Sequence, residues 1–129
     1  MKKEIFIIVF IILLIVIFHI VTQKNTDSFF ESISDDLSNL EDTVLSENFE
    51  KDQLEKDINE LQDKWKPKYD FFACFIEHDE LEKVHTQLIS IDANLKVEDY
   101  DKSIDEIEKC KFILKHIEEK DSLKIVNIF

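Results

Sequence analysis

Residues 5–21 read IFIIVFIILLIVIFHIV, and residues 30–44 read FESISDDLSNLEDTV. The first stretch is apolar at every position except His19. Its 17 residues would span roughly 25 Å as a helix, slightly under a hydrocarbon core, and Met1 and Thr22 can make up the difference. Nothing else in the chain could cover such an all-round apolar cylinder as a buried core helix. The stretch therefore predicts a transmembrane helix that contacts membrane lipid through residues 5–21.

The flanking residues predict whether this span is cleaved and how it is oriented. A signal peptidase site needs small residues at A-x-A spacing, but here the run ends Ile-Val-Thr-Gln-Lys. We therefore expect an uncleaved signal anchor. Lys2 and Lys3 precede the span, and only Lys24 follows it within twenty residues. The positive-inside rule then places residues 1–4 in the cytoplasm and residues 22–129 outside a cell membrane crossed once.

The composition of the chain excludes several classes of fold and function. Glycine and arginine are absent, and Pro67 is the only proline. Sheets need glycine and proline for turns and bulges, so the scarcity of these two residues favours long helices. The absence of glycine also excludes glycine-rich phosphate loops. Residues 22–129 carry 14 lysines and 28 acidic residues, a net charge of −14. Nucleic acid and anionic headgroups would be repelled, so we expect no nucleic-acid partner.

Apolar residues of the acidic domain recur at steps of three and four, which is typical of amphipathic helices. These stripes are Phe30, Ile33, Leu37, Leu40 and Val44; Leu54, Ile58, Leu61 and Trp65; Leu81, Val84, Leu88, Ile91 and Leu95; and Tyr100, Ile104, Ile107, Cys110, Leu114 and Ile117. We expect Pro67 to cause a kink or short break around residues 64–68, with the helix resuming through Phe71. We expect the apolar tail, residues 122–129, to fold back onto the bundle.

The expected fold class is therefore all-α, an N-terminal transmembrane helix followed by a small antiparallel bundle of about three helices, one of them kinked near Pro67. The expected organisation is residues 1–4 cytoplasmic, 5–21 transmembrane and 22–129 an acidic extracytoplasmic domain.

Three short motifs give the chain a family resemblance. They are Trp65, the segment Phe75-Ile76-Glu77-His78-Asp79-Glu80-Leu81 and the ending Asn127-Ile128-Phe129. With the N-terminal span, they resemble an uncharacterised domain-of-unknown-function family of short, single-span bacterial membrane proteins. That family shares a tryptophan-bearing helix, an aromatic-x-x-His-x-Glu segment and an Asn-Ile-Phe ending. The resemblance implies an architecture and not an activity, and Pro67 departs from the family pattern.

Histidines and acids near residue 80 are the strongest candidates for chemistry. Glu82-x-x-His85 has the spacing of a di-iron half-site, but the chain contains no second such pair. On a helical wheel His116 faces solvent, which argues against a metal cluster with His78. Glu77, however, falls within the apolar stripe, and a buried acid needs a partner. We expect Lys115 on the facing helix to be that partner.

The two cysteines are predicted not to form a disulfide. If the last two helices pair about residues 96 and 97, Cys74 and Cys110 are offset by eight residues, roughly 12 Å. A disulfide needs Cα atoms within about 7 Å. We therefore expect two separate small core residues, without the arrangement of a cysteine nucleophile.

These observations predict a non-enzymatic interaction or scaffold protein with no catalytic residue, no metal site and no cofactor. Its expected partner is another membrane protein or a second copy of itself. The alternative is an extracytoplasmic sensor of a cation or small ligand that uses the Glu77-His78-Glu80 region.

The predicted orientation can be tested with reporters fused after Phe129. A reporter active only outside the cytoplasm should be active there, because the lysines flank the span on its N-terminal side. Activity from a cytoplasm-only reporter at the same position would reverse the orientation. A mature N-terminus beginning after Val21 would exclude the uncleaved anchor.

Overall fold

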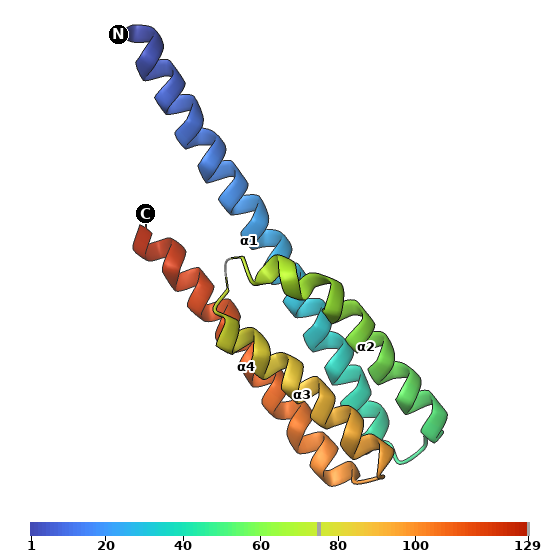
Figure 1. The fold of residues 1–129 in the computed structure, drawn as a ribbon. Helices are drawn as coiled ribbons and strands as arrows, with labels where there is room; N and C mark the ends of the chain where they lie inside the picture. Colours follow the sequence, from blue (N-terminus) through green and yellow to red (C-terminus); the bar gives the residue numbers. More distant parts are fainter. Residues whose placement is uncertain (75, 129) are drawn as a thin grey trace.

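The computed structural model describes residues 1–74 and 76–128, with side chains described as far as Lys120 apart from Phe75. Four helices run alternately in opposite directions (Figure 1). They are α1 (Lys2–Leu45), α2 (Lys51–Phe72), α3 (His78–Lys96) and α4 (Tyr100–Ile128). No described residue lies in a strand. The expected all-α class is confirmed.

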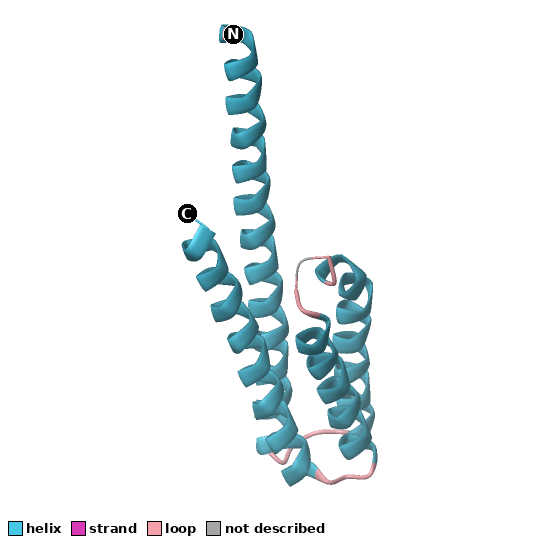
Figure 2. Cartoon of the chain, turned by 60° about the vertical axis from the view of Figure 1, so that its left-hand side comes forward, coloured by secondary structure: helices cyan, strands magenta, loops and turns pink. Residues whose placement is uncertain are grey.

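Helix α1 is uninterrupted over 44 residues, and its two halves have different surroundings. The half that contains residues 5–21 projects beyond the other helices (Figure 2), and its apolar side chains are exposed. By length and composition this helix could cross a membrane. The other half buries its stripe from Phe30 to Val44, as the spacing predicts. We call the end of the bundle nearest residue 22 the proximal end and the opposite end the distal end.

The bundle has four helices rather than the expected three. Each helix contacts two neighbours, in the cyclic order α1, α2, α3, α4, and the described residues show no contact between helices at opposite corners. The second half of α1 is therefore a full member of the bundle. The fourth helix arises because the chain reverses between Phe72 and His78, within what was expected to be one kinked helix.

Pro67 does not interrupt α2, which continues for five more residues to Phe72. A proline inside a helix leaves a carbonyl one turn earlier without its amide donor. That carbonyl belongs to Asp63, which is exposed like Pro67. Water can therefore hydrate it, and the helix tolerates the lost hydrogen bond. The break falls instead at residues 73–77, where the reversal lets both Phe72 and Ile76 enter the core. On one continuous helix these two side chains would point away from the stripe.

The proximal part of the core is aromatic. Phe72 lies 5.1 Å from Phe30 and 5.2 Å from Phe29, measured between ring centroids, and Trp65 lies 6.2 Å from Phe30. Phe30, Trp65 and Phe72 are at most 1% exposed. Each fully buried large side chain contributes roughly 1.5–3 kcal/mol. This cluster fixes the end of α2 against the point where α1 enters the bundle.

The predicted fold-back of residues 122–129 is not seen in the backbone. Helix α4 instead continues without a turn to Ile128. The side chains of residues 121–128, and Phe129 as a whole, lie outside the described residues.

The two distal turns each place a glutamate in the left-handed region, with φ of 57° at Glu47 and 61° at Glu98. At the end of α3, the Glu98 amide donates to the Leu95 carbonyl at 3.2 Å and the Asp99 amide donates to the Asn94 carbonyl at 2.9 Å. This pair of bonds defines a Schellman motif, whose left-handed position normally holds glycine. Because the chain has no glycine, a glutamate occupies this position in a sterically unfavourable conformation.

Replacing Glu98 by glycine should therefore stabilise the protein. We expect Glu98→Gly to raise the free energy of unfolding by about 0.5–1 kcal/mol, because glycine adopts positive φ without a steric cost. Glu60→Gly is the matched control, since Glu60 is exposed within α2 and should lose about 0.5–1 kcal/mol. Urea unfolding of the three proteins measures both effects. A destabilised Glu98→Gly variant would contradict the turn geometry.

Candidate interaction surface

The residues of the predicted sensor region each contact a different side chain. Glu77 is exposed at the N-cap of α3, where its carboxylate lies 3.0 Å from Nζ of Lys120. The predicted partner Lys115 is wrong, and Glu77 does not lie within the apolar stripe. Both errors come from the reversal at residues 73–77, which begins α3 only at His78 and shifts its register against α4. Glu80 lies 3.5 Å from Nζ of Lys83 on its own helix.

Two of the histidines, His78 and His85, pack on the same tyrosine, Tyr69. His78 contacts the Tyr69 hydroxyl through Nδ1 at 3.3 Å and lies 3.7 Å from Glu82 through Nε2. The ring of His85 lies 5.9 Å from that of the same Tyr69. His116 is exposed, as the helical wheel predicts. Within the described residues, no three His, Cys, Asp or Glu side chains gather where they could hold a metal. The sensor hypothesis stays an untested prediction.

The two cysteines are separate free thiols, but only one belongs to the core. Cys110 is fully buried on α4, and burial raises the pKa of its thiol to about 12. Cys74 was expected in the core and is instead exposed in the α2–α3 connection. The reversal after Phe72 takes Cys74 off the buried face on which a continuous helix would have held it.

A salt-bridge network joins α1 and α4 along the line of contact between them, which we call the α1–α4 seam. Nζ of Lys111 lies 2.8 Å from Glu41 on α1 and 3.1 Å from Glu108 on α4. It also donates to the Ser38 hydroxyl at 3.4 Å. The hydrogen bond to Glu41 raises the pKa of Lys111, so this lysine stays charged. The network joins α4 to the helix that carries the apolar segment.

Towards the proximal end, the same seam has an excess of acids. Asp27 and Glu31 of α1 act electrostatically on Glu118 of α4, as does neighbouring Glu119. Burial and then these like charges raise the pKa of Glu118 to about 7. Burial, with a contribution from Glu31, also raises the pKa of Asp27. In the described part of the chain, Glu118 has no ion pair within 4.0 Å.

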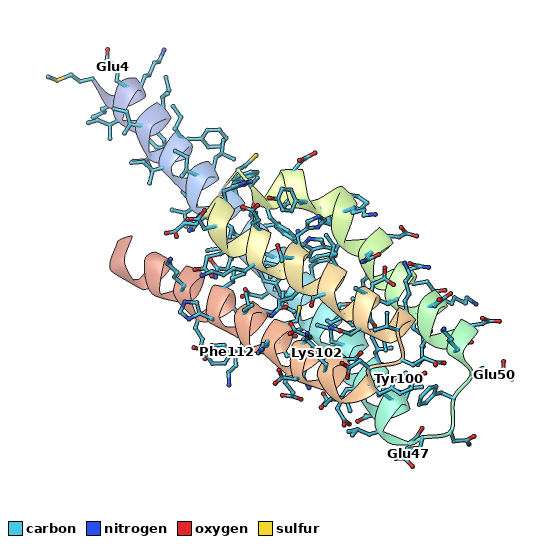
Figure 3. All side chains as sticks on the ribbon, turned by 60° about the horizontal axis from the view of Figure 1, so that its bottom comes forward. Glu4, Glu47, Glu50, Tyr100, Lys102 and Phe112 are labelled. Carbon is cyan, nitrogen blue, oxygen red and sulfur yellow. The ribbon has the colours of Figure 1, made fainter. Side chains whose placement is uncertain are left out.

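An open groove of about 510 Å³ runs along this seam beside Phe112. It is lined by Glu31, Ser34, Asp35, Glu108, Lys111, Phe112, Leu114, Lys115 and Glu118. Phe112 is 72% exposed, although it sits in the middle of α4 (Figure 3). The groove therefore combines an accessible aromatic ring with a mainly acidic rim.

Phe112 does not belong to any of the apolar stripes predicted from the sequence. The available signal was its register, because Phe112 falls between the stripe positions Cys110 and Leu114 and so cannot face the core with them. A single exposed apolar residue is normal on a protein surface, so Phe112 becomes a candidate contact residue only because it lines a groove.

Fold and surface together define a class of protein, a small antiparallel four-helix bundle whose first helix extends into an exposed apolar segment. The chain belongs to the family described as domain of unknown function DUF4363, whose model matches residues 20–128. The predicted membership of an uncharacterised family is confirmed. No curated protein and no solved structure matches the chain.

The raised pKa of Glu118 predicts how stability depends on pH. Because the folded value of about 7 exceeds the ordinary 4.5, folding becomes less favourable as the pH rises between these values. We expect Glu118→Gln to melt higher than the parent protein at about pH 8 and at nearly the same temperature at about pH 4. Asp63→Asn, at an exposed site on α2, is the control. Equal melting temperatures for Glu118→Gln and the parent at both pH values would contradict the crowding of acids at this seam.

Proposed function

We propose that this chain is a single-pass membrane protein of the cell envelope that acts without catalysis, by binding another membrane protein through the α1–α4 groove. The observation that carries the proposal is the exposure of Phe112 beside an acidic groove. The anchor would be residues 5–21, with residues 1–4 in the cytoplasm and residues 22–129 outside.

The anchoring part of the proposal is supported by the shape and charge of α1. Its apolar residues project away from the bundle, and an exposed apolar cylinder of this length is unfavourable in water but suited to a bilayer. Lys2 and Lys3 precede it, and Lys24 alone follows closely. This asymmetry favours a cytoplasmic N-terminus.

Phe112 has the properties of an interface anchor. Aromatic side chains supply much of the binding energy at protein interfaces, and they act best when a partner seals them from water. The neighbouring residue Lys111 is paired with Glu41 of α1, so the backbone that carries Phe112 is held against α1. Binding at an already ordered backbone costs less conformational entropy than binding at a flexible one.

The acidic rim indicates the chemistry of the partner. Glu31, Asp35, Glu108 and Glu118 line the groove with two lysines, of which Lys111 is already bound by acids. A partner segment with basic residues around an apolar side chain would complement this surface. A second copy would bring more acid to the same groove, since each domain carries a charge of −14. We therefore favour a different membrane protein over a homo-oligomer.

Photocrosslinking in native membranes tests this proposal. A benzophenone amino acid at Phe112 should give one dominant crosslinked product that mass spectrometry identifies as another membrane protein. The matched control is the same probe at Glu60, which is exposed on α2, a helix that shows no contact with α4 among the described residues. A self-crosslink would favour the homo-oligomer, and equal products at both positions would contradict the proposed surface.

A further inference from the structure

The end of α4 extends past the chain reversal between α2 and α3. Lys120 pairs at 3.0 Å with Glu77, the residue just before α3. Helix α4 then continues for eight more residues to Ile128, about 12 Å along its axis. Figure 1 and Figure 2 both show this end beyond the α2–α3 connection, on the side toward which α1 projects. Beyond Lys120, α1 is the one described helix that runs alongside α4.

The electrostatic contacts between α1 and α4 give the level of this end relative to the membrane span. Glu118 of α4 interacts with Asp27 and Glu31 of α1. The two helices are antiparallel and rise equally per residue, so each residue further along α4 lies level with one residue earlier on α1. Ile128 follows Glu118 by ten residues and therefore lies level with residues 17–21.

The ion pair between Lys111 and Glu41 gives a similar level. Its two charged atoms are 2.8 Å apart, and Ile128 follows Lys111 by 17 residues, which places it level with residue 24 of α1. Both estimates lie within about 6 Å of Val21, the predicted end of the span. The interfacial layer beyond the hydrocarbon is roughly 5–8 Å thick. The last turn of α4 therefore lies at the level of this layer.

The exposure of the apolar segment shows which of its faces has a neighbour. Among residues 5–21, only Val16 and His19 are half-buried. They continue the face of α1 that carries the buried residues Thr26 and Phe30, because steps of three, seven and four return to the same side of a helix. Helix α4 is the neighbour that reaches this level, since α2 ends and α3 begins at the chain reversal.

The end of α4 has a composition suited to contact with lipid. Residues 122–129 read SLKIVNIF, with five apolar residues, one lysine and no acid. With about 3.6 residues per turn, these apolar positions are spread around the whole helix, whereas α1 borders only one side of it. The described helices leave the other sides open to the surroundings. Such an apolar helix end is unfavourable in water and suits the boundary of a bilayer.

The acidic charge of the domain is concentrated away from this end. The distal part of the bundle, residues 32–62 and 86–114, carries 17 acids and 6 lysines. The proximal part, residues 22–31, 63–85 and 115–129, carries 11 acids and 8 lysines. The net charge is therefore −11 in the distal part and −3 in the proximal part. The repulsion from anionic headgroups expected of the whole domain applies mainly to its distal part.

We propose that the last turn of α4, residues 125–128, lies in the interfacial layer of the bilayer that α1 crosses, on the side of the domain. The domain is then attached to the membrane by two helix ends, and its acidic distal end points away from the surface. This inference rests on the anchoring part of the proposed function, because the level of α4 is measured from the span. The contact is apolar, so it forms with zwitterionic lipid as well as with anionic lipid.

Fluorescence quenching on the full chain in phosphatidylcholine nanodiscs measures this contact. In a Cys74→Ser background, Cys110 is buried and its thiol pKa is raised to about 12, so a fluorescent maleimide should label only a newly introduced cysteine. A fraction of the lipids carries a nitroxide near the head of an acyl chain. We expect at least twofold stronger quenching at Asn127→Cys than at Lys102→Cys, an exposed site at the distal end of the same helix.

Charged substitutions separate contact with lipid from mere nearness to it. Ile125→Glu combined with Ile128→Glu should reduce the quenching at residue 127 by at least half, because a carboxylate is costly to remove from water. Ile89→Glu combined with Val97→Glu, at exposed apolar sites away from α4's end, should leave the quenching unchanged. Circular dichroism of each variant checks that a loss of quenching is not a loss of the fold.

The outcomes distinguish this inference from the proposed function. A chain that fails to elute with the discs overturns both the anchor and the contact of α4. A chain that elutes with the discs, but is quenched no more at Asn127→Cys than at Lys102→Cys, overturns only the contact of α4. Quenching that the paired glutamates at the end of α4 leave unchanged does the same.

Discussion

A single ladder of backbone hydrogen bonds runs from Lys2 to Leu45, so the apolar segment and the first helix of the bundle form one rigid element. The transition between them is made by Thr26, which is buried and donates its hydroxyl to the Thr22 carbonyl at 2.8 Å. A polar side chain can be buried there because its own helix satisfies it. The core begins one turn later, at Phe30. The buried stripe of α1, on which the other helices pack, therefore lies at a fixed position along the same helix as the apolar segment.

Three chain reversals around this helix give the molecule two different ends. The distal end has two tight turns, each with a glutamate at positive φ, and it lies in the acidic part of the chain. The proximal end has the aromatic core, the end of α4 and the apolar segment. Such polarity suits a domain held at a surface, because like charges are kept far from a membrane or gathered where a basic partner can neutralise them.

The titratable groups near residue 80 do not converge on one site among the described residues. Glu77, His78 and Glu80 each contact a different partner, and the described side chains form no convergent set of metal ligands. Glu118, whose pKa is raised to about 7, lies instead in the seam that Phe112 borders. A cationic group of a partner would stabilise the charged form of a carboxylate that neighbouring acids destabilise.

Local patterns in the sequence determined the helices, the buried stripes and the apolar segment. Periodicity is a property of neighbouring residues, and it records which side of each helix needs an apolar environment whatever lies opposite. The motifs at Trp65, His78 and the last three residues were enough to indicate the family. They could not indicate a partner, because short motifs carry no information on surface geometry.

The tertiary structure alone decided where the chain reverses. The hydrogen bond lost at Pro67 is a local effect that water can offset on an exposed face. The reversal after Phe72 instead buries Phe72 and Ile76 together, which stabilises the protein only once the core has assembled. That choice moved Cys74 to the surface and paired Glu77 with Lys120 instead of Lys115. The groove beside Phe112 also required the packing of α4 on α1, since its walls come from residues far apart in the chain.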